Sequence, residues 1–388
     1  MSALPTTSLP RRAVVLVWAL AVATIGLAAL RFNVLPLFVG AVVTKFGIGS
    51  ARAGIFVSAL FAASTAAGVF TSLLLHRLNR RLVLVSSLIW VSVGTTLSIL
   101  AKGFPVFFVM QVITGIGGGV MGVVCYSLLG DLDHEDLVFG SLYAVTVLTA
   151  ALSLYVLPAF LARFGLDGLL IGAGSASLVL AVLAWFVPAV NGKLSRSPAA
   201  MHGITVPAAI GLTAIFLWSV SQSVYWVYVE RLGYGFGLSA GFIGSVLATA
   251  TLGSGAVPVI GATLSRRFGH AKPLLVCTAI MSAGLLMLTD RPTGLWFGAA
   301  VIGHSLAWGL YEPYLNSLTA LADVNGRAVP WIQPVGGIGI ALGPLFGSAV
   351  VTDQSLAGPL YASVLTLVAS SVCAAVSIRR MSPKPDRP

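Results

Sequence analysis

Charged side chains are scarce in this sequence of 388 residues, at 9% of the total, whereas soluble proteins carry about a quarter. Hydrophobic residues make up 57% of the chain, and the mean hydropathy is +0.99. So few charges cannot cover a chain of this size with a water-soluble surface. The composition therefore excludes a soluble globular protein and predicts an integral membrane protein.

Cysteine is also rare. The three cysteines, Cys125, Cys277 and Cys373, all lie in apolar segments and lack the close spacing of zinc ligands. Three scattered cysteines are too few for a disulfide framework. We therefore expect no disulfide framework, no metal site and no cofactor.

Long apolar runs make up most of the sequence. Twelve of them approach the roughly 20 residues that a helix needs to cross a bilayer. They lie at about 14–43, 52–75, 82–101, 105–129, 138–162, 168–188, 205–229, 239–263, 273–289, 294–319, 328–352 and 357–378. The breaks between them carry most of the charges and many turn residues. The expected fold is all-α, with twelve transmembrane helices.

A polar linker at 191–203 divides the twelve runs six and six. The halves repeat weakly, because the segment 46–50 after the first run is echoed by 236–239 after the seventh. Repeated halves with a site between them are the architecture of many secondary transporters. We expect two pseudo-repeated six-helix bundles, one at 1–190 and one at 204–388, joined by the linker.

Lysine and arginine predict the orientation. With a cytoplasmic N-terminus, 15 of the 22 basic residues fall on the cytoplasmic side and 6 on the other, which places both termini inside. The net charge of +11 then reflects the basic residues that orient the chain in the membrane. Nucleic-acid binding is not expected, because the basic residues are spread over short loops. The 17 arginines against 5 lysines, with many alanines and glycines, fit a GC-rich bacterium, and we expect a bacterial cell inner membrane.

Two basic loops and two glycine-rich helices carry a resemblance to a known family. The loops are Ser72–Arg81 after the second run and Gly261–Lys272 after the eighth, and the glycine-rich segments are Gln111–Gly119 and Gly336–Gly347. In this order they resemble the motifs of the major facilitator superfamily (MFS), over nearly the whole chain. The resemblance implies the MFS fold and transport by alternating access, in which two bundles rock about a central site.

The loops and the fourth run depart from the family pattern. His76 and Arg266 stand where the family usually has aspartate, and Gln111 stands where it has an arginine. The fifth run lacks the glycine-proline motif of the family's antiporters, which disfavours a drug/proton antiporter. The glycines of the fourth run are expected to serve helix packing.

Four basic residues of the loops remain candidates for conformational gating. They are Arg77, Arg81, Arg266 and Arg267. They could pair with helix C-termini or with the acidic loop 131–136, or they could act only as a topology signal.

Arg31 is the one full charge inside the first run. An arginine at that depth costs on the order of 3 kcal/mol on insertion scales, so it should face a polar cavity or a partner. There it would attract an anionic group of a substrate. The alternative is an arginine that bonds a helix carbonyl or extends to the membrane surface.

Other candidate substrate contacts lie on the fourth, seventh and tenth runs, which line the cavity in the resembled family. Steps of three and four residues put polar and aromatic side chains of the seventh and tenth runs on one face. The predicted substrate-binding residues are Arg31, Gln111, Trp218, Gln222, Tyr225, His304, Trp308 and Tyr311. The amides and the histidine would orient a substrate, and the aromatic rings would contact its apolar part. Packing is the other interpretation of these stripes.

Glu312 is the only carboxylate that we expect inside a run, whereas Glu230 is placed at a helix end. A carboxyl group in a dry site can exchange a proton near neutral pH, so Glu312 is the predicted proton-coupling residue. A static ion pair with Arg31 is the alternative.

These features predict a secondary active transporter, a monomer in the lipid bilayer, that moves a small organic anion by proton-coupled symport. The alternative is a proton-driven exporter of amphipathic compounds, for which Glu312 and the aromatic faces would suffice. A membrane-embedded enzyme is more remote, since it would rest on His134 within the acidic loop, without a second histidine cluster. No selectivity-filter repeat or soluble domain suggests a channel or receptor. We therefore expect no enzymatic activity.

Overall fold

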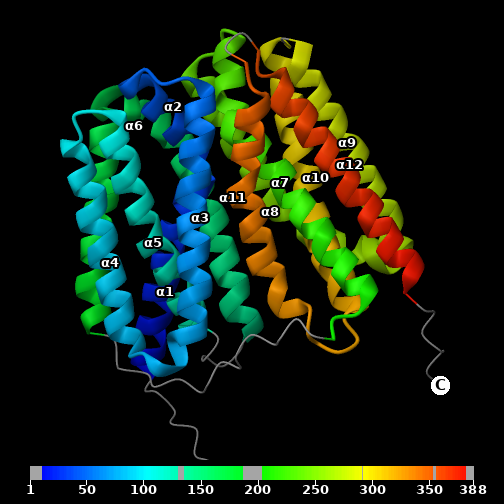
Figure 1. Cartoon of the computed structure of the whole chain (residues 1–388), viewed down its shortest axis with the longest axis horizontal. Helices are drawn as coiled ribbons and strands as arrows, with labels where there is room; N and C mark the ends of the chain where they lie inside the picture. Colours follow the sequence, from blue (N-terminus) through cyan, green and yellow to red (C-terminus); the bar gives the residue numbers. More distant parts are fainter. Residues whose placement is uncertain (1–10, 130–134, 187–202, 291, 353–354, 382–388) are drawn as a thin grey trace, which may run out of the picture.

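The computed structural model describes residues 11–129, 135–186, 203–290, 292–352 and 355–381, and these ranges are almost entirely helical (Figure 1). The α-helices are α1 (Arg11–Asn33), α2 (Leu35–Phe46), α3 (Ser50–Leu74), α4 (Arg80–Leu97), α5 (Phe104–Leu129), α6 (Glu135–Trp185), α7 (Val206–Gly235), α8 (Ala240–Phe268), α9 (Ala271–Met287), α10 (Gly294–Ala322), α11 (Ile332–Val350) and α12 (Ala357–Arg380). Short 3-10 helices η1 (Leu75–Arg77), η2 (Ser98–Leu100), η3 (Leu288–Asp290) and η4 (Val329–Trp331) adjoin them.

The prediction of twelve membrane spans is confirmed. Ten helices of the described chain are long and apolar enough to cross a membrane. One of them, α6, is two spans, because Gly165 breaks it with φ 62°, a left-handed conformation that glycine adopts without strain. Helix α10 supplies the twelfth, since its 29 residues reach about 44 Å at 1.5 Å per residue. Large apolar side chains such as Leu152 and Leu365 lie exposed, as expected for surfaces in contact with lipid.

The first predicted span, 14–43, differs from the structure in one respect. It is two helices, α1 and α2, joined at Val34, whose φ and ψ are −93° and 10°. The reason is Pro36 in the first turn of α2, because proline has no N–H to donate to the carbonyl four residues earlier. Without the break, the polar end of α1 and the apolar α2 would lie on one straight axis.

The two halves of the chain repeat the same helix contacts. In the first, α1 packs on α5 and α6, and α4 packs on α5 and α6. In the second, α7 packs on α10 and α12, and α9 packs on the same two helices. The beginning of α1 and the end of α12 lie at the same end of the molecule, at the bottom of Figure 1. The architecture is therefore a pair of pseudo-repeated bundles.

Glycines set the closest approaches inside each half. A Cβ at Gly119 of α5 would overlap the Ser64 carbonyl oxygen of α3, and a Cβ at Gly309 of α10 would overlap that of Ser254 in α8. These contacts occupy corresponding places in the two halves. The prediction that the glycines of the fourth span serve packing is thus confirmed for Gly119, where a side chain would push α3 and α5 apart.

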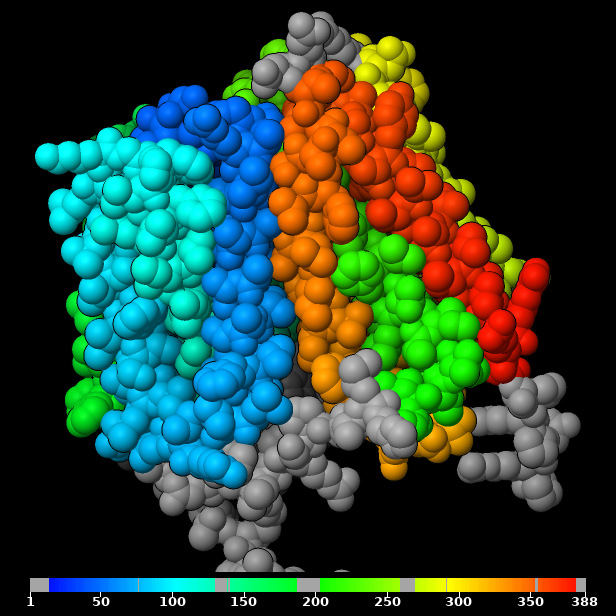
Figure 2. Space-filling model, viewed as in Figure 1, coloured from blue at the N-terminus to red at the C-terminus, as the bar shows by residue number. Residues whose placement is uncertain are grey.

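In the described chain, three helix pairs make most of the contacts between the halves: α3 with α11, α6 with α8, and α2 with α7. Figure 2 shows α3 (blue) and α11 (orange) in contact along the middle of the molecule. Hydrogen bonds between the halves include one from Trp226 Nε1 to the Phe32 carbonyl, at 2.7 Å, and one from Thr65 Oγ1 to the Gly337 carbonyl, at 3.4 Å. Apolar and small-residue contacts provide the rest.

Candidate functional site

A cavity of about 470 Å³ lies within the first half and contains Arg31. Residues of helices α1 to α6 line it, and most of its wall is aliphatic. Its polar groups include Arg31, Thr95, Gln111 and Ser153. The structure thus brings two of the predicted substrate contacts, Arg31 and Gln111, to one cavity.

The Arg31 guanidinium is only partly satisfied. Its Nη2 donates to Thr95 Oγ1 at 3.2 Å, whereas Nη1 is shielded from solvent and has no partner. Gly118 of α5 leaves the space next to it open, because a Cβ there would still be 3.7 Å from Nη1. In the described part of the chain no ion pair joins Arg31 to Glu312. One face of the guanidinium can therefore accept an anionic group.

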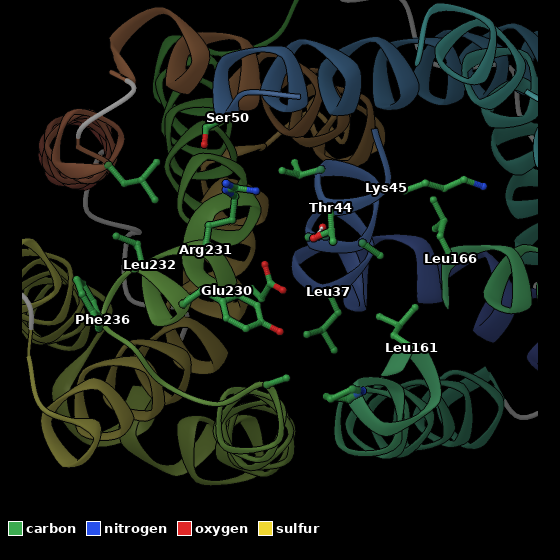
Figure 3. Close-up of a pocket in the computed structure, with 18 of the residues that line it drawn as sticks. Leu37, Thr44, Lys45, Ser50, Leu161, Leu166, Glu230, Arg231, Leu232 and Phe236 are labelled. Carbon is green, nitrogen blue, oxygen red and sulfur yellow. Dashed lines mark hydrogen bonds between the residues drawn. The ribbon is translucent and has the colours of Figure 1, made fainter. Parts of the chain in front are cut away.

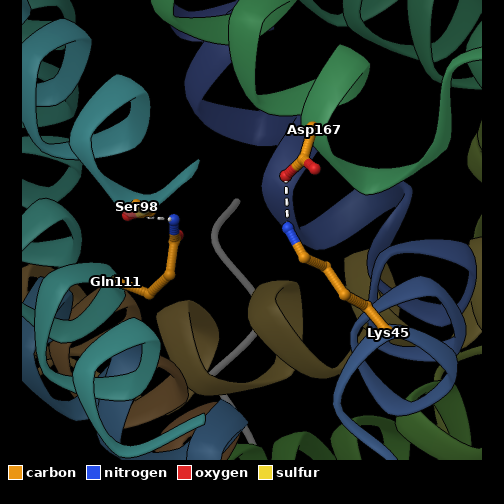
Figure 4. A network of polar contacts seen from close by, with 4 residues as sticks. All are labelled: Lys45, Ser98, Gln111 and Asp167. Atoms are coloured by element: carbon orange, nitrogen blue, oxygen red, sulfur yellow. Dashed lines mark hydrogen bonds and ion pairs between the residues drawn. The ribbon is translucent and has the colours of Figure 1, made fainter. Parts of the chain in front are cut away.

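Gln111 is held against the neighbouring helix. It is 3% exposed, and its Nε2 donates to Ser98 Oγ at 3.0 Å (Figure 4). The same figure shows an ion pair between Lys45 of α2 and Asp167 of α6, which joins two helices of the first half.

The predicted contacts of the second half form a separate buried cluster. His304 Nε2 lies 3.0 Å from Gln222 Oε1, and the rings of His304 and Tyr225 are 4.3 Å apart. All three side chains are about 1% exposed. Gln222 Nε2 and the Tyr225 hydroxyl have no hydrogen-bond partner. These side chains, which helical spacing placed on shared faces, lie together in a cluster. The helices of the second half enclose this cluster.

Tyr311 is fixed within the second half. Its hydroxyl lies 3.1 Å from Ser370 Oγ and 2.9 Å from Ser371 Oγ, both on α12, and its ring stacks on Trp218. The side chain is fully buried. These contacts give Tyr311 a packing role between α7, α10 and α12 in this structure.

Aromatic rings from both halves meet around Trp308 of α10. Its ring centroid lies 5.9 Å from Trp226, 6.2 Å from Trp218 and 6.4 Å from Phe32. Trp308 Nε1 donates to Glu312 Oε2 at 3.2 Å. Glu312 therefore lies beside the aromatic cluster between the halves, not beside Arg31.

The four predicted gating residues divide into two groups. Arg77 lies in η1, and the Arg81 guanidinium of α4 lies 5.0 Å from the centre of the Trp185 ring, so Arg81 packs within the first half. The side chains of Arg266 and Arg267 lie outside the described residues, as do residues 131–134 of the acidic loop and the side chains of Glu135 and Asp136.

Glu230 is a functional candidate that the sequence interpretation missed. We placed it at a helix end outside the membrane, but α7 continues to Gly235 and the Glu230 side chain is only 3% exposed. Figure 3 shows its carboxylate directed toward Leu37 and Thr44 of α2. The signal was present in the sequence, because Glu230 follows Trp226 by four residues and so shares its face of α7.

The hydrogen bond between Trp226 and Phe32 follows from Pro36. In an uninterrupted helix the Phe32 carbonyl would accept the N–H of residue 36, and proline has none. Trp226 Nε1 from the other half satisfies this carbonyl instead, at 2.7 Å. The break between α1 and α2 thus creates a hydrogen-bond acceptor for the second half.

Replacing Trp226 with phenylalanine is expected to destabilise the joined halves by about 1–3 kcal/mol, because a buried carbonyl loses its donor. In a Pro36→Ala background the loss should shrink, since residue 36 can then donate to Phe32. Melting curves of the double-mutant cycle measure this coupling. Trp90→Phe is the matched control, because Trp90 donates to the Ile113 carbonyl within one half. Equal losses in both backgrounds would contradict the assignment.

Comparisons with known proteins agree with this architecture. The family model described as Major Facilitator Superfamily matches residues 20–321. Among solved structures, the nucleoside transporter NupG superposes with a TM-score of 0.73 at 12% identity, over 95% of this chain and 98% of that one.

A bacterial homologue of the human lysosomal transporter Spinster, in an inward-facing and occupied conformation, superposes with a TM-score of 0.71 at 16% identity, over 96% of this chain and 98% of that one. A search of curated protein sequences finds no match. At these identities the solved structures establish the fold alone.

Proposed function

The chain belongs to the Major Facilitator Superfamily, and on that premise we propose that it is a secondary active transporter of a small organic anion, coupled to protons. It is a multi-pass membrane protein with the fold of this family's transporters. Transport would proceed by alternating access, in which the two halves rock about the interface that α2, α3 and α6 make with α7, α11 and α8.

The observation that carries the anion assignment is the unpaired Arg31 Nη1 beside the cavity. A buried guanidinium with a free donor is costly, and a carboxylate or phosphate group would satisfy it with charge-assisted hydrogen bonds. The cavity volume of about 470 Å³ suits a small organic molecule, and its aliphatic wall suits the uncharged part.

Unpaired donors in the second half supply further polar contacts. Trp218 Nε1, Gln222 Nε2 and the Tyr225 hydroxyl are buried without partners. Our proposal assigns them, with His304, Trp308 and Tyr311, to the face that meets the substrate when the halves rearrange. Arg31 and Gln111 supply the contacts of the first half.

The test is a binding and transport screen of the purified protein. Small organic anions, cations and neutral aromatics are first compared by thermal shift, because a ligand that binds the native state raises its melting temperature. Compounds that stabilise the protein are then followed in proteoliposomes with and without a pH gradient. Stabilisation and uptake of anions would support the proposal, whereas stabilisation by cations or neutral amphiphiles alone would overturn it.

Proton coupling is assigned to Glu312. Glu312→Gln is expected to abolish accumulation driven by a pH gradient while substrate exchange continues, because glutamine carries no exchangeable acid proton. The amide oxygen can still accept the hydrogen bond from Trp308, so packing is preserved. Uptake of labelled substrate with and without the gradient measures the effect. Gradient-driven accumulation that persists in the variant would show that another group couples the proton.

The second candidate function is a proton-driven exporter of amphipathic compounds. The aromatic cluster of Trp218, Trp226 and Trp308 beside Glu312 favours it, because rings and a carboxylate suit a cation with an apolar body. Arg31 separates the two functions, since export of cationic or neutral compounds should survive its replacement.

We also propose that the protein lies as a monomer in the inner membrane of a bacterium with both termini in the cytoplasm. The shared end of α1 and α12 supports termini on one side, and the bias of basic residues supports that side as cytoplasmic. The moving units would be residues 1–190 and 204–388, with 191–203 as the linker.

A further inference from the structure

A second cavity, of about 1060 Å³, lies between the halves at the end of the molecule where α2 and α7 end. Its wall includes Gly40 and Thr44 of α2, Asp167 of α6, and Glu230 and Arg231 of α7. With both termini in the cytoplasm, this cavity opens on the opposite face of the membrane. It is separate from the cavity that holds Arg31.

Glu230 lies at the base of this cavity, and one of its carboxylate oxygens has no hydrogen-bond partner. Its Oε2 is shielded from solvent and accepts no hydrogen bond. Lys45 is engaged by Asp167, and no ion pair joins Glu230 to Arg231 in the described chain. Figure 3 shows the Arg231 side chain near Ser50, away from the Glu230 carboxylate.

Gly40 makes the close contact with Glu230 possible. A Cβ at residue 40 would overlap both carboxylate oxygens of Glu230. The carboxyl group therefore packs on bare backbone of α2, where α2 meets α7. Any separation of these two helices would expose the carboxyl group to the water of the cavity.

We propose that Glu230 binds a proton when α2 closes on α7 and releases it when the two helices separate. An ionised carboxylate in the closed contact would be a buried charge outside any ion pair, whereas the neutral acid fits there at far lower cost. The proton comes from water in the cavity and returns to it. The proposal rests on the proposed transport function, to which it adds a second proton site on the face opposite the termini.

The other charged or titratable groups around Glu230 do not explain such a response. They are Lys45 of α2, Asp167 of α6, and Tyr228, Arg231 and Tyr234 of α7. Among ordinary side chains only histidine changes charge between pH 5 and 8, and the lining of this cavity includes no histidine. A pH response of this contact in that range therefore points to Glu230.

The test measures how fast a water-soluble maleimide labels Leu37→Cys. Leu37 precedes Gly40 by three residues on α2, lines the cavity and is 2% exposed. Thr44→Cys, on the exposed end of α2, gives the intrinsic pH dependence of the reagent. The unmodified chain gives the background of its own cysteines.

Relative to Thr44→Cys, labelling of Leu37→Cys is expected to rise about tenfold or more from pH 5 to 8. An equilibrium linked to one proton changes by at most about tenfold per pH unit, and loss of the proton favours the open form. With Glu230→Gln, labelling should be slow at both pH values, because the amide mimics the neutral acid. An unchanged pH response in Glu230→Gln would overturn the proposal.

Gly40→Ala provides a second, opposite test. The added methyl group should prevent closure, so that Leu37→Cys is labelled fast at both pH values. Glu230→Ala in the same chain should restore slow labelling, because it removes the overlapping carboxyl group. Gly26→Ala is the matched control, since a Cβ there meets nothing within 4 Å. If Leu37→Cys is labelled slowly in the Gly40→Ala chain that keeps Glu230, the proposed contact between residue 40 and Glu230 is wrong.

The labelling experiment tests the role of Glu230 independently of the proposed transport function. Labelling requires no substrate, and a Glu312→Gln chain should keep its pH response. Loss of transport with the pH response intact would overturn the proposed function alone. Transport with no pH response at Leu37→Cys would overturn the role of Glu230 alone.

Discussion

Replacing Arg31 with glutamine is expected to lower the affinity for an anionic substrate and its uptake about 10- to 100-fold, the loss that follows when one charge-assisted hydrogen bond is removed. Glutamine is two bonds shorter than arginine and carries no charge to attract the anion. Thermal-shift titration measures the affinity, and uptake into proteoliposomes measures transport. Anion-induced stabilisation should vanish with the charge.

Two control variants separate charge from geometry at Arg31. Arg31→Lys keeps the charge but lacks the planar fork with which the guanidinium can bond Thr95 and a planar anion from separate nitrogens, so an intermediate loss is expected. Thr95→Val removes the oxygen that holds Nη2 and leaves the guanidinium in place, so it should have the smallest effect. Equal stabilisation by anions in Arg31→Gln and the native protein would show that Arg31 is structural.

Gly119→Ala is expected to lower the free energy of unfolding by about 3 kcal/mol, the upper part of the range for overpacking. The new methyl group would overlap the Ser64 carbonyl oxygen, and backbone cannot move aside as a side chain can. Helices α3 and α5 must then separate. The melting temperature in detergent measures the loss.

Gly122→Ala, one turn further along α5, is the matched control. A Cβ there meets nothing within 4 Å, and alanine favours a helix by up to about 1 kcal/mol over glycine, so no loss is expected. Gly309→Ala should behave like Gly119→Ala, because it faces Ser254 at the corresponding place of the second half. If Gly122→Ala lowers the free energy of unfolding as much as Gly119→Ala does, the cause is the loss of any glycine from α5 and not the contact with Ser64.

The spans could be predicted from the sequence because a bilayer imposes a local requirement, a long apolar run. The break at Val34 was missed because Pro36 lies within such a run and hardly lowers its hydropathy. Glu230 was placed outside the membrane for the converse reason, since the adjoining charges of Glu230 and Arg231 end the apolar run before α7 ends. The burial of the carboxylate against Gly40, 190 positions away in the chain, depends on how α7 packs on α2.

How the candidate site residues are grouped in space could be predicted only in part. Helical spacing correctly put Gln222 and Tyr225 on one face of α7, and the structure adds His304 to them. The separation of Arg31 from Glu312 and the serines that hold Tyr311 depend on how distant helices pack. The roles of these residues in substrate binding stay predictions.

The Phe32 carbonyl has a mechanical consequence for a protein whose halves move. Pro36 leaves this carbonyl without a donor in its own helix, so its bond to Trp226 can be exchanged for water without unwinding a turn. Such an exchange changes the free energy by only about 0.5–1.5 kcal/mol, because a hydrogen bond is replaced and not lost. In the proposed transport cycle, the two halves would therefore part and rejoin here while each helix keeps its own backbone bonds. The proline in the first span thus leads to a hydrogen bond between the halves that can break and form again.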